Sequence, residues 1–83
     1  MEEQRKASRF RALKAAQMVF NDGASTIDCT LRDISDRGAR LKVESPVGIP
    51  ERFTLLIVAD GGHYECQVAW RRVDEIGVVF ENR

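Results

Sequence analysis

Alternation of apolar and polar residues, interrupted at regular intervals by turn residues, runs through the sequence from Lys14 onward. Successive side chains of a β-strand point to opposite faces, so a period of two predicts strands with one buried face. Glycine, proline, asparagine or aspartate lies in the breaks between the runs, as expected for turns. We therefore expect strands at 14–20, 25–32, 39–44, 53–59, 63–70 and 76–80.

Short strands at this spacing favour a small closed antiparallel barrel over an open sheet, because closure leaves no exposed strand edges. The 83 residues suffice for one domain, near the lower limit for burying a core without disulfides or metal. The sequence thus predicts an all-β, six-stranded antiparallel split barrel over 14–83, preceded by a flexible basic N-terminal arm over 1–13. The fourth run is apolar on both faces, so it is either covered twice or presents Leu56 and Val58 to a partner.

The charges of the chain balance, with 13 Lys and Arg against 13 Asp and Glu. A neutral total argues against holding a long nucleic acid through the overall field. Residues 1–14 nevertheless contain five cations and two anions, a net +3, and the remaining chain carries −3. This asymmetry predicts a local anion site at the arm.

Metal, redox and catalytic sites lack their usual residues. Cys29 and Cys66 are the only cysteines and show no C-x-x-C spacing, and His63 is the only histidine. Both cysteines alternate with apolar residues, which predicts buried thiols in the core. Catalysis would need a nucleophile with a base, paired carboxylates or a metal. We therefore expect a binding protein that is not an enzyme and has no cofactor.

No run approaches the roughly 20 apolar residues that a membrane span requires. The first residues, Met1 to Arg5, also lack the apolar stretch of a signal peptide. These features predict a cytoplasmic location and no membrane span.

Two short motifs carry the recognition chemistry. Arg5 and Arg9 form an R-x-x-x-R in the arm, and Asp33, Ser35 and Gly38 form a D-x-S-x-x-G between the second and third predicted strands. The arginine fork pairs with phosphate or with guanine O6 and N7, and its flat face packs on a purine. A carboxylate accepts hydrogen bonds from guanine N1–H and its 2-amino group. Glycine permits a positive φ and close approach of a ligand to the backbone. The two motifs together indicate an anionic guanine ligand.

Each motif also has a purely structural interpretation. The two arginines of the arm would be solvated cations on a frayed helix, because residues 4–18 have fair helical propensity. The second motif would be an ordinary turn whose carboxylate and hydroxyl bind nearby backbone amides.

In their order, spacing and position on a six-strand pattern, the motifs and the closing segment from Trp70 to Phe80 resemble the PilZ domain, a bacterial receptor module for cyclic di-GMP. The resemblance covers nearly the whole chain. It implies a cyclic di-GMP receptor. If the protein only binds, we expect the signal to come from the arm, because a segment that orders on the ligand changes shape and charge, which a downstream effector protein can read.

The resemblance also implies roles for the motif residues. The two arginines stack on and hydrogen-bond the guanines and phosphates, while the second motif holds a guanine edge through the Asp33 carboxylate, Ser35 and the Gly38 backbone. Gln4 stands where many strong binders have a further arginine, so the number of bound nucleotides, one or two, stays open. The family's C-terminal helix has no counterpart before Arg83, so residues 10–14 or a second subunit would cover the barrel mouth, and a homodimer is one expected assembly.

Two rival functions remain. A small nucleic-acid-binding barrel would grip phosphates with the arm and stack bases on its sheet. Such a sheet needs exposed aromatic rings. We expect the aromatic side chains of the strands to lie on core faces, namely those of Phe20, Phe53, Tyr64, Trp70 and Phe80. This expectation argues against DNA or RNA as a partner. The other rival is a PilZ-like module that binds no nucleotide and contacts a protein through Leu56 and Val58.

Overall fold

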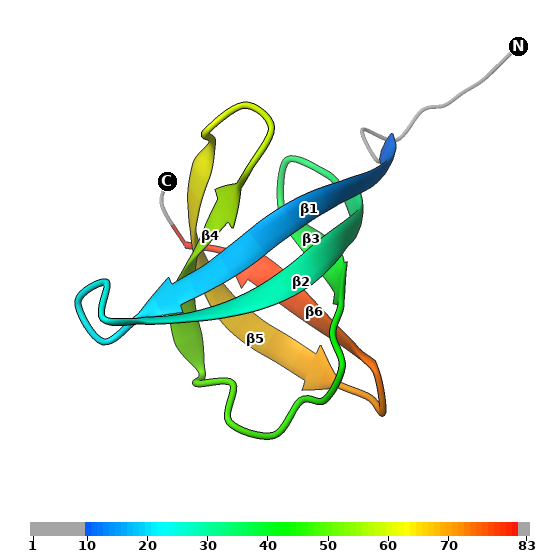
Figure 1. Cartoon of the computed structure of the whole chain (residues 1–83). Helices are drawn as coiled ribbons and strands as arrows, with labels where there is room; N and C mark the ends of the chain where they lie inside the picture. The colour runs from blue at the N-terminus through cyan, green and yellow to red at the C-terminus, as the bar shows by residue number, and fades with distance from the viewer. Residues whose placement is uncertain (1–9, 82–83) are drawn as a thin grey trace, which may run out of the picture.

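The computed structural model describes residues 10–81, and this part of the chain contains strands and no helix (Figure 1). The strands are β1 Phe10–Phe20, β2 Ser25–Ile34, β3 Gly38–Lys42, β4 Arg52–Ile57, β5 His63–Arg71 and β6 Glu75–Phe80. Except at the start of β1, each strand begins and ends within two residues of its predicted limits. The alternation in the sequence thus located all of these elements.

The strands close into a barrel in the order β1-β2-β3-β6-β5-β4, and every neighbouring pair is antiparallel. The long strand β1 crosses the front of the barrel in Figure 1 and closes it by pairing with β2 on one edge and β4 on the other. The predicted six-stranded antiparallel barrel is confirmed. Closure pairs strands that are distant in sequence, which places the β2–β3 turn beside β6 and, beyond it, β5.

The hairpin between β1 and β2 turns on Asn21, Asp22 and Gly23, whose φ angles are 54°, 55° and 87°. Asparagine, aspartate and glycine are the residues that best tolerate this left-handed region. The Gly23 N–H donates to the Phe20 carbonyl at 3.1 Å, which closes the predicted turn.

Strand β1 begins at Phe10, four residues before the predicted start at Lys14. A register shift between Arg11 and Lys14, with Leu13 at a φ of 48°, separates these first residues from the regular part of the strand. The bulge interrupts the alternation, which explains why the sequence did not indicate a strand here. The helix considered for residues 4–18 is excluded over 10–18, where the chain is extended.

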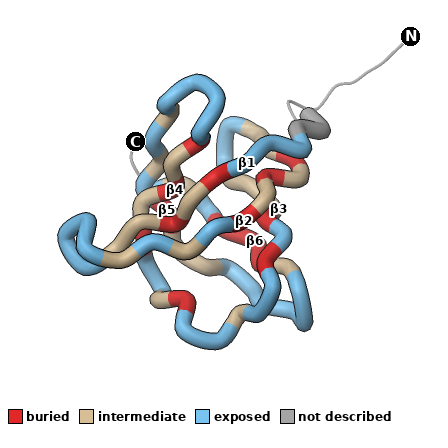
Figure 2. Tube along the Cα trace, viewed as in Figure 1, coloured by how far each residue is buried: buried red, intermediate tan, exposed pale blue. Residues whose placement is uncertain are grey.

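Every strand contributes at least one buried residue to the core, and Figure 2 marks the buried positions in red along the trace. Met18, Leu31, Leu41, Leu55 and Ile76 are fully buried and come from five different strands. Burying side chains of this size stabilises a fold by about 1.5 to 3 kcal/mol each. The interior therefore ties the strands together and leaves the outer face and the strand ends for recognition.

The predicted burial of both thiols is confirmed, and neither Cys29 nor Cys66 is in a disulfide. Burial disfavours the charged thiolate and raises the pKa of each thiol to about 12 from an ordinary value of 9.0. The folded state therefore favours the protonated thiols, and its stability falls as pH rises from about 9, where unfolded thiols ionise, towards 12.

We expect iodoacetamide at pH 9.5 to leave both cysteines unmodified in the folded protein and to alkylate both in denaturant, because only the thiolate reacts. Mass spectrometry after timed quenching measures the difference. Alkylation at equal rates in the two conditions would contradict the burial of the thiols.

Most aromatic side chains pack as predicted. Phe53 is buried, whereas Phe20, Tyr64 and Phe80 are partly buried against the core. The rings of Tyr64 and Phe80 stack with their centroids 4.7 Å apart. In addition, Leu56 is half-buried, and Val58 is exposed just beyond the end of β4.

The prediction that Trp70 faces the core is wrong, because 37% of this residue is exposed. A register shift lies between Val68 and Trp70 in the pairing of β5 with β6. An extra residue in one strand reverses the faces of the side chains that follow it, so the alternation before the bulge does not continue to Trp70.

Candidate ligand-binding site

The D-x-S-x-x-G motif forms the turn between β2 and β3. The Ser35 N–H donates to the Gly38 carbonyl at 2.8 Å, and the Ser35 hydroxyl accepts from the backbone N–H groups of Arg37 at 3.2 Å and Gly38 at 3.3 Å. These contacts are the turn-stabilising role considered for the hydroxyl from the sequence. Ser35 therefore fixes the shape of the turn, and its role in ligand binding stays a prediction.

Gly38 is required by the neighbouring strand β6 rather than by its own backbone angles. Its φ lies outside the left-handed region, so the positive φ that glycine permits is not used here. A Cβ on Gly38 would lie 2.1 Å from the Val78 carbonyl oxygen. The absence of a side chain at Gly38 therefore lets the backbone of β6 lie close against the turn.

Asp33 lies near the end of β2 and is the only charged residue among residues 13–81 that is buried. Its partner across the strand pair is Arg40 of β3. The Arg40 Nη2 donates to the Asp33 Oδ2 at 2.8 Å, which makes a charge-assisted hydrogen bond. The sequence interpretation of Asp33 as a turn residue did not include this ion pair.

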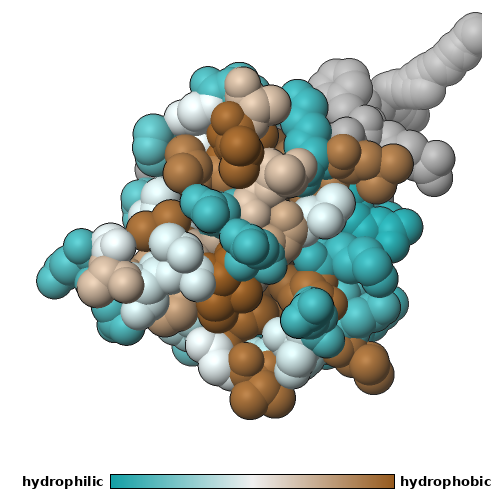
Figure 3. Space-filling model, viewed as in Figure 1, coloured by the Kyte–Doolittle hydropathy of each residue, from teal (hydrophilic) through white to brown (hydrophobic). Residues whose placement is uncertain are grey.

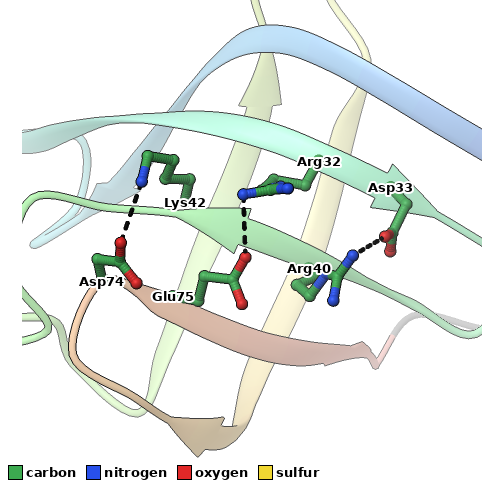
Figure 4. Close-up of polar contacts among 6 residues, drawn as sticks. All are labelled: Arg32, Asp33, Arg40, Lys42, Asp74 and Glu75. Carbon is green, nitrogen blue, oxygen red and sulfur yellow. Dashed lines mark hydrogen bonds and ion pairs between the residues drawn. The ribbon is translucent and has the colours of Figure 1, made fainter.

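The Asp33 pair is one of three ion pairs that lie in a row over β2, β3 and the start of β6 (Figure 4). Arg32 contacts Glu75 at 3.3 Å, and Lys42 contacts Asp74 at 3.0 Å. The Lys42 ammonium hydrogen-bonds the Asp74 carboxyl and holds its pKa below the ordinary value. The outer face of the barrel is therefore a charged surface in which Asp33 is the most deeply placed acid of the three.

A groove of about 240 Å³ joins this turn to β5 and β6. Asp33, Ser35 and Gly38 line it on one side, and Trp70 and Gly77 line it on the other. The remaining lining residues are Arg37, Ala39, Arg40, Ala69, Val78 and Val79. The fold thus brings all three residues of the second motif to one concave surface and adds an aromatic ring to it.

Gly77 allows Trp70 to lie close against β6. The two residues are cross-strand partners, and a Cβ on Gly77 would lie 2.3 Å from the indole Nε1. The Arg72 guanidinium carbon lies 4.8 Å from the centroid of the indole, close enough for a cation–π contact. Strand β6 and Arg72 together hold the ring at the edge of the groove.

Comparison with known protein families decides the relationship that the motifs indicate. The model of the PilZ domain family matches residues 3–83, essentially the whole chain. The chain belongs to the PilZ domain family. No match was found among curated proteins. The family comprises binding modules for cyclic di-GMP, some of whose members do not bind this ligand, and its members are generally not enzymes.

Arg5 and Arg9 of this PilZ domain lie outside the described residues, so their placement in the site stays a prediction. The start of β1 nevertheless lies at the end of the barrel that carries the second motif. Arg9 directly precedes Phe10, and the Cα partners of Phe10 and Arg11 are Ile34 and Asp33. The chain therefore enters the barrel beside the second motif.

Arg40 and Trp70 are the groove residues that the sequence did not single out. Arg40 and Lys42 alternate with the inward Leu41 as ordinary outward charges. The contact of Arg40 with Asp33 depends on a register shift between Leu31 and Asp33. Gly77 is the sequence feature that could have indicated the placement of Trp70, because a glycine inside a strand often marks a close approach by another group.

A larger hollow of about 850 Å³ lies elsewhere on this PilZ domain, between the first half of β2 and the segment after β3. Ile27, Cys29, Val43 and Val47 are among its lining residues, and none of the motif residues is. Figure 3 has the same view as Figure 1 and shows apolar surface among hydrophilic residues below the position that β2 occupies in Figure 1. We favour the smaller groove because it contains guanine-binding chemistry, which size alone does not provide.

Residues 10–81 contain no group of three or more His, Cys, Asp or Glu side chains arranged to hold a metal ion. In the same range, no helix has the length and apolar character needed to cross a membrane.

Proposed function

We propose that this domain binds cyclic di-GMP in the groove between the β2–β3 turn and Trp70. The observation that carries the proposal is the convergence of a buried acid, a tight turn and an exposed aromatic ring, all in a chain of the PilZ family. The residues come from β2, β3 and β5, so the barrel rather than the local sequence assembles them.

Asp33 supplies the guanine-specific contact. A carboxylate accepts hydrogen bonds from guanine N1–H and the 2-amino group, whereas adenine presents an acceptor at N1. The Asp33 side chain is only 10% exposed, and a buried acceptor left without its hydrogen bonds is costly, which sharpens discrimination.

Trp70 supplies a flat apolar surface. Aromatic rings stack on nucleobases with about 1 to 3 kcal/mol per base. Because β6 and Arg72 hold the indole in place, little side-chain freedom remains for the ligand to remove.

The groove is small for a whole dinucleotide, since ligand pockets usually enclose about 300 to 1,000 Å³. At about 240 Å³ it accommodates part of the ligand, and further groups must cover the rest. Arg5 and Arg9 fit this need, because guanidinium groups pair with phosphate and pack on purines. We infer that the arm orders over the bound nucleotide and that a downstream effector protein reads this change.

Isothermal titration calorimetry tests the proposal. The domain should bind cyclic di-GMP in preference to cyclic di-AMP, GTP and GMP, because only the first combines two guanines with a cyclic phosphate backbone. Equal binding of the adenine analogue would remove Asp33 from base recognition, and no binding of cyclic di-GMP would overturn the function.

One observation favours a second candidate, the nucleic-acid-binding barrel, because Trp70 is exposed contrary to expectation. Trp70 is, however, the one aromatic residue among the exposed large hydrophobic residues identified in the described chain. A stacking surface for several bases would need more rings.

We expect no mobility shift of single-stranded RNA or DNA at micromolar protein and about 150 mM salt, where screening weakens the few phosphate contacts available. Micromolar binding that is lost on Trp70→Ala would move the assignment to the nucleic-acid class.

A further inference from the structure

We propose that Arg40 is a positioning residue that orients the Asp33 carboxylate towards the N1–H and 2-amino edge of guanine. The inference rests on the proposed function and deepens it. It assigns part of the ligand's base specificity to a residue of β3 outside both sequence motifs.

The contact between the two side chains is short and sheltered. The Arg40 Nη2 lies 2.8 Å from the Asp33 Oδ2, and the two residues face each other directly across β2 and β3. Aspartate side chains have a broad preference at their last torsion, so an unrestrained carboxylate can turn about the bond to its Cβ. A charge-assisted hydrogen bond to one oxygen restrains this turn and fixes the plane of the carboxylate.

The bond to Arg40 is compatible with ligand binding. An ionised carboxylate has about four acceptor positions on its two oxygens, and the bond from Arg40 to Oδ2 takes one of them. Arginine also supplies the positive charge that a buried acid requires. Arg40 can therefore stay paired with Asp33 while the carboxylate accepts from a base.

Arg40 is itself held in the middle of the groove. Its cross-strand partner on the other side is Gly77, and the partner of Gly77 is Trp70. Asp33, Arg40, Gly77 and Trp70 thus form one row across four strands of the barrel. The Arg40 Nε is buried and has no hydrogen-bond partner among the described residues, so the bond from Nη2 to Asp33 is the anchor that the structure gives this guanidinium.

The neighbouring pair of Arg32 and Glu75 offers a matched control. Its arginine is exposed to nearly the same extent, 37% against 38%, and it bridges the same outer face at 3.3 Å. Neither member lines the groove. Replacing either arginine removes one positive charge and one cross-strand ion pair. Only the replacement of Arg40 should in addition change the recognition of the base.

The test compares cyclic di-GMP with cyclic di-IMP, which lacks the 2-amino groups and keeps N1–H, O6 and the phosphates. Wild-type protein should prefer cyclic di-GMP by roughly tenfold to a hundredfold, the scale for a hydrogen bond to a charged group. In Arg40→Met this ratio should fall below about threefold, since the carboxylate loses the charge-assisted bond that orients it towards the 2-amino group. Arg32→Met should keep the wild-type ratio.

The ratio separates positioning from other roles. If Arg40 acted only as a charge on the phosphates, both affinities would fall together and the ratio would stay, which would overturn the inference. Arg40→Leu, which likewise lacks a donor for Asp33, is the second variant should Arg40→Met fail to fold, and an unchanged ratio there is equally contradictory. If wild-type protein bound neither nucleotide, the proposed function would fail together with this inference. Wild-type binding with an unaltered ratio in the variants would remove the role of Arg40 alone.

Discussion

Arg9→Ala should weaken the binding of cyclic di-GMP by about 2 to 5 kcal/mol, the usual cost of truncating one member of a hydrogen-bonded charge pair. Arg9→Lys should also bind poorly, because lysine lacks the planar fork and the flat face that packs on a purine. Calorimetric titration measures both effects. Arg52→Ala is the matched control, since this arginine is 70% exposed in its pair with Glu81 and is not a groove residue.

The melting temperature of unliganded Arg9→Ala should stay close to that of wild type. Among the residues whose burial the structure describes, the core begins at Ala16, and we expect an exposed arm to contribute little to it. A large fall in the unliganded melting temperature, or full binding by Arg9→Ala, would assign Arg9 a structural role instead.

Gly38→Ala should lower the free energy of unfolding by about 3 kcal/mol or more, towards the upper end of overpacking effects. The new Cβ would meet the Val78 carbonyl at 2.1 Å, and this atom belongs to the backbone of β6, which cannot rotate away as a side chain can. Strands β3 and β6 would have to separate at the edge of the groove. Denaturant unfolding followed by circular dichroism measures the loss.

Gly62→Ala is the control for this substitution. Its Cβ would meet the Asp60 Oδ1 at 3.1 Å, which is the end of an exposed, adjustable side chain. We expect a change below about 1 kcal/mol there. Equal destabilisation by the two substitutions would show that the approach of β6 to Gly38 is not the cause.

The barrel could be predicted from the sequence because its strands alternate between a core face and an outer face. Leu31 and Leu41, for example, occupy the expected inward positions and are cross-strand partners. The bulges could not be predicted in this way, since an extra residue changes the phase of the alternation without a compositional mark. This is why the strand at Phe10 and the outward face of Trp70 were missed.

The candidate site was predictable only where its residues are close in sequence. Asp33, Ser35 and Gly38 lie within one turn and do share a groove. Arg40 and Trp70 join them through strand register and barrel closure, which depend on pairings distant in the sequence. The function of Gly38 also depends on such a pairing, because the group that it accommodates belongs to β6.

Fluorescence of the single tryptophan tests most directly whether the nucleotide occupies the groove. Trp70 is the only tryptophan in the chain, it is partly exposed, and it lines the groove, so its emission reports on this site alone. We expect cyclic di-GMP to quench and shift the emission, with a midpoint equal to the dissociation constant from calorimetry, because a stacked purine alters the surroundings of the indole. Calorimetric binding that leaves the emission of Trp70 unchanged would place the ligand elsewhere and contradict the account.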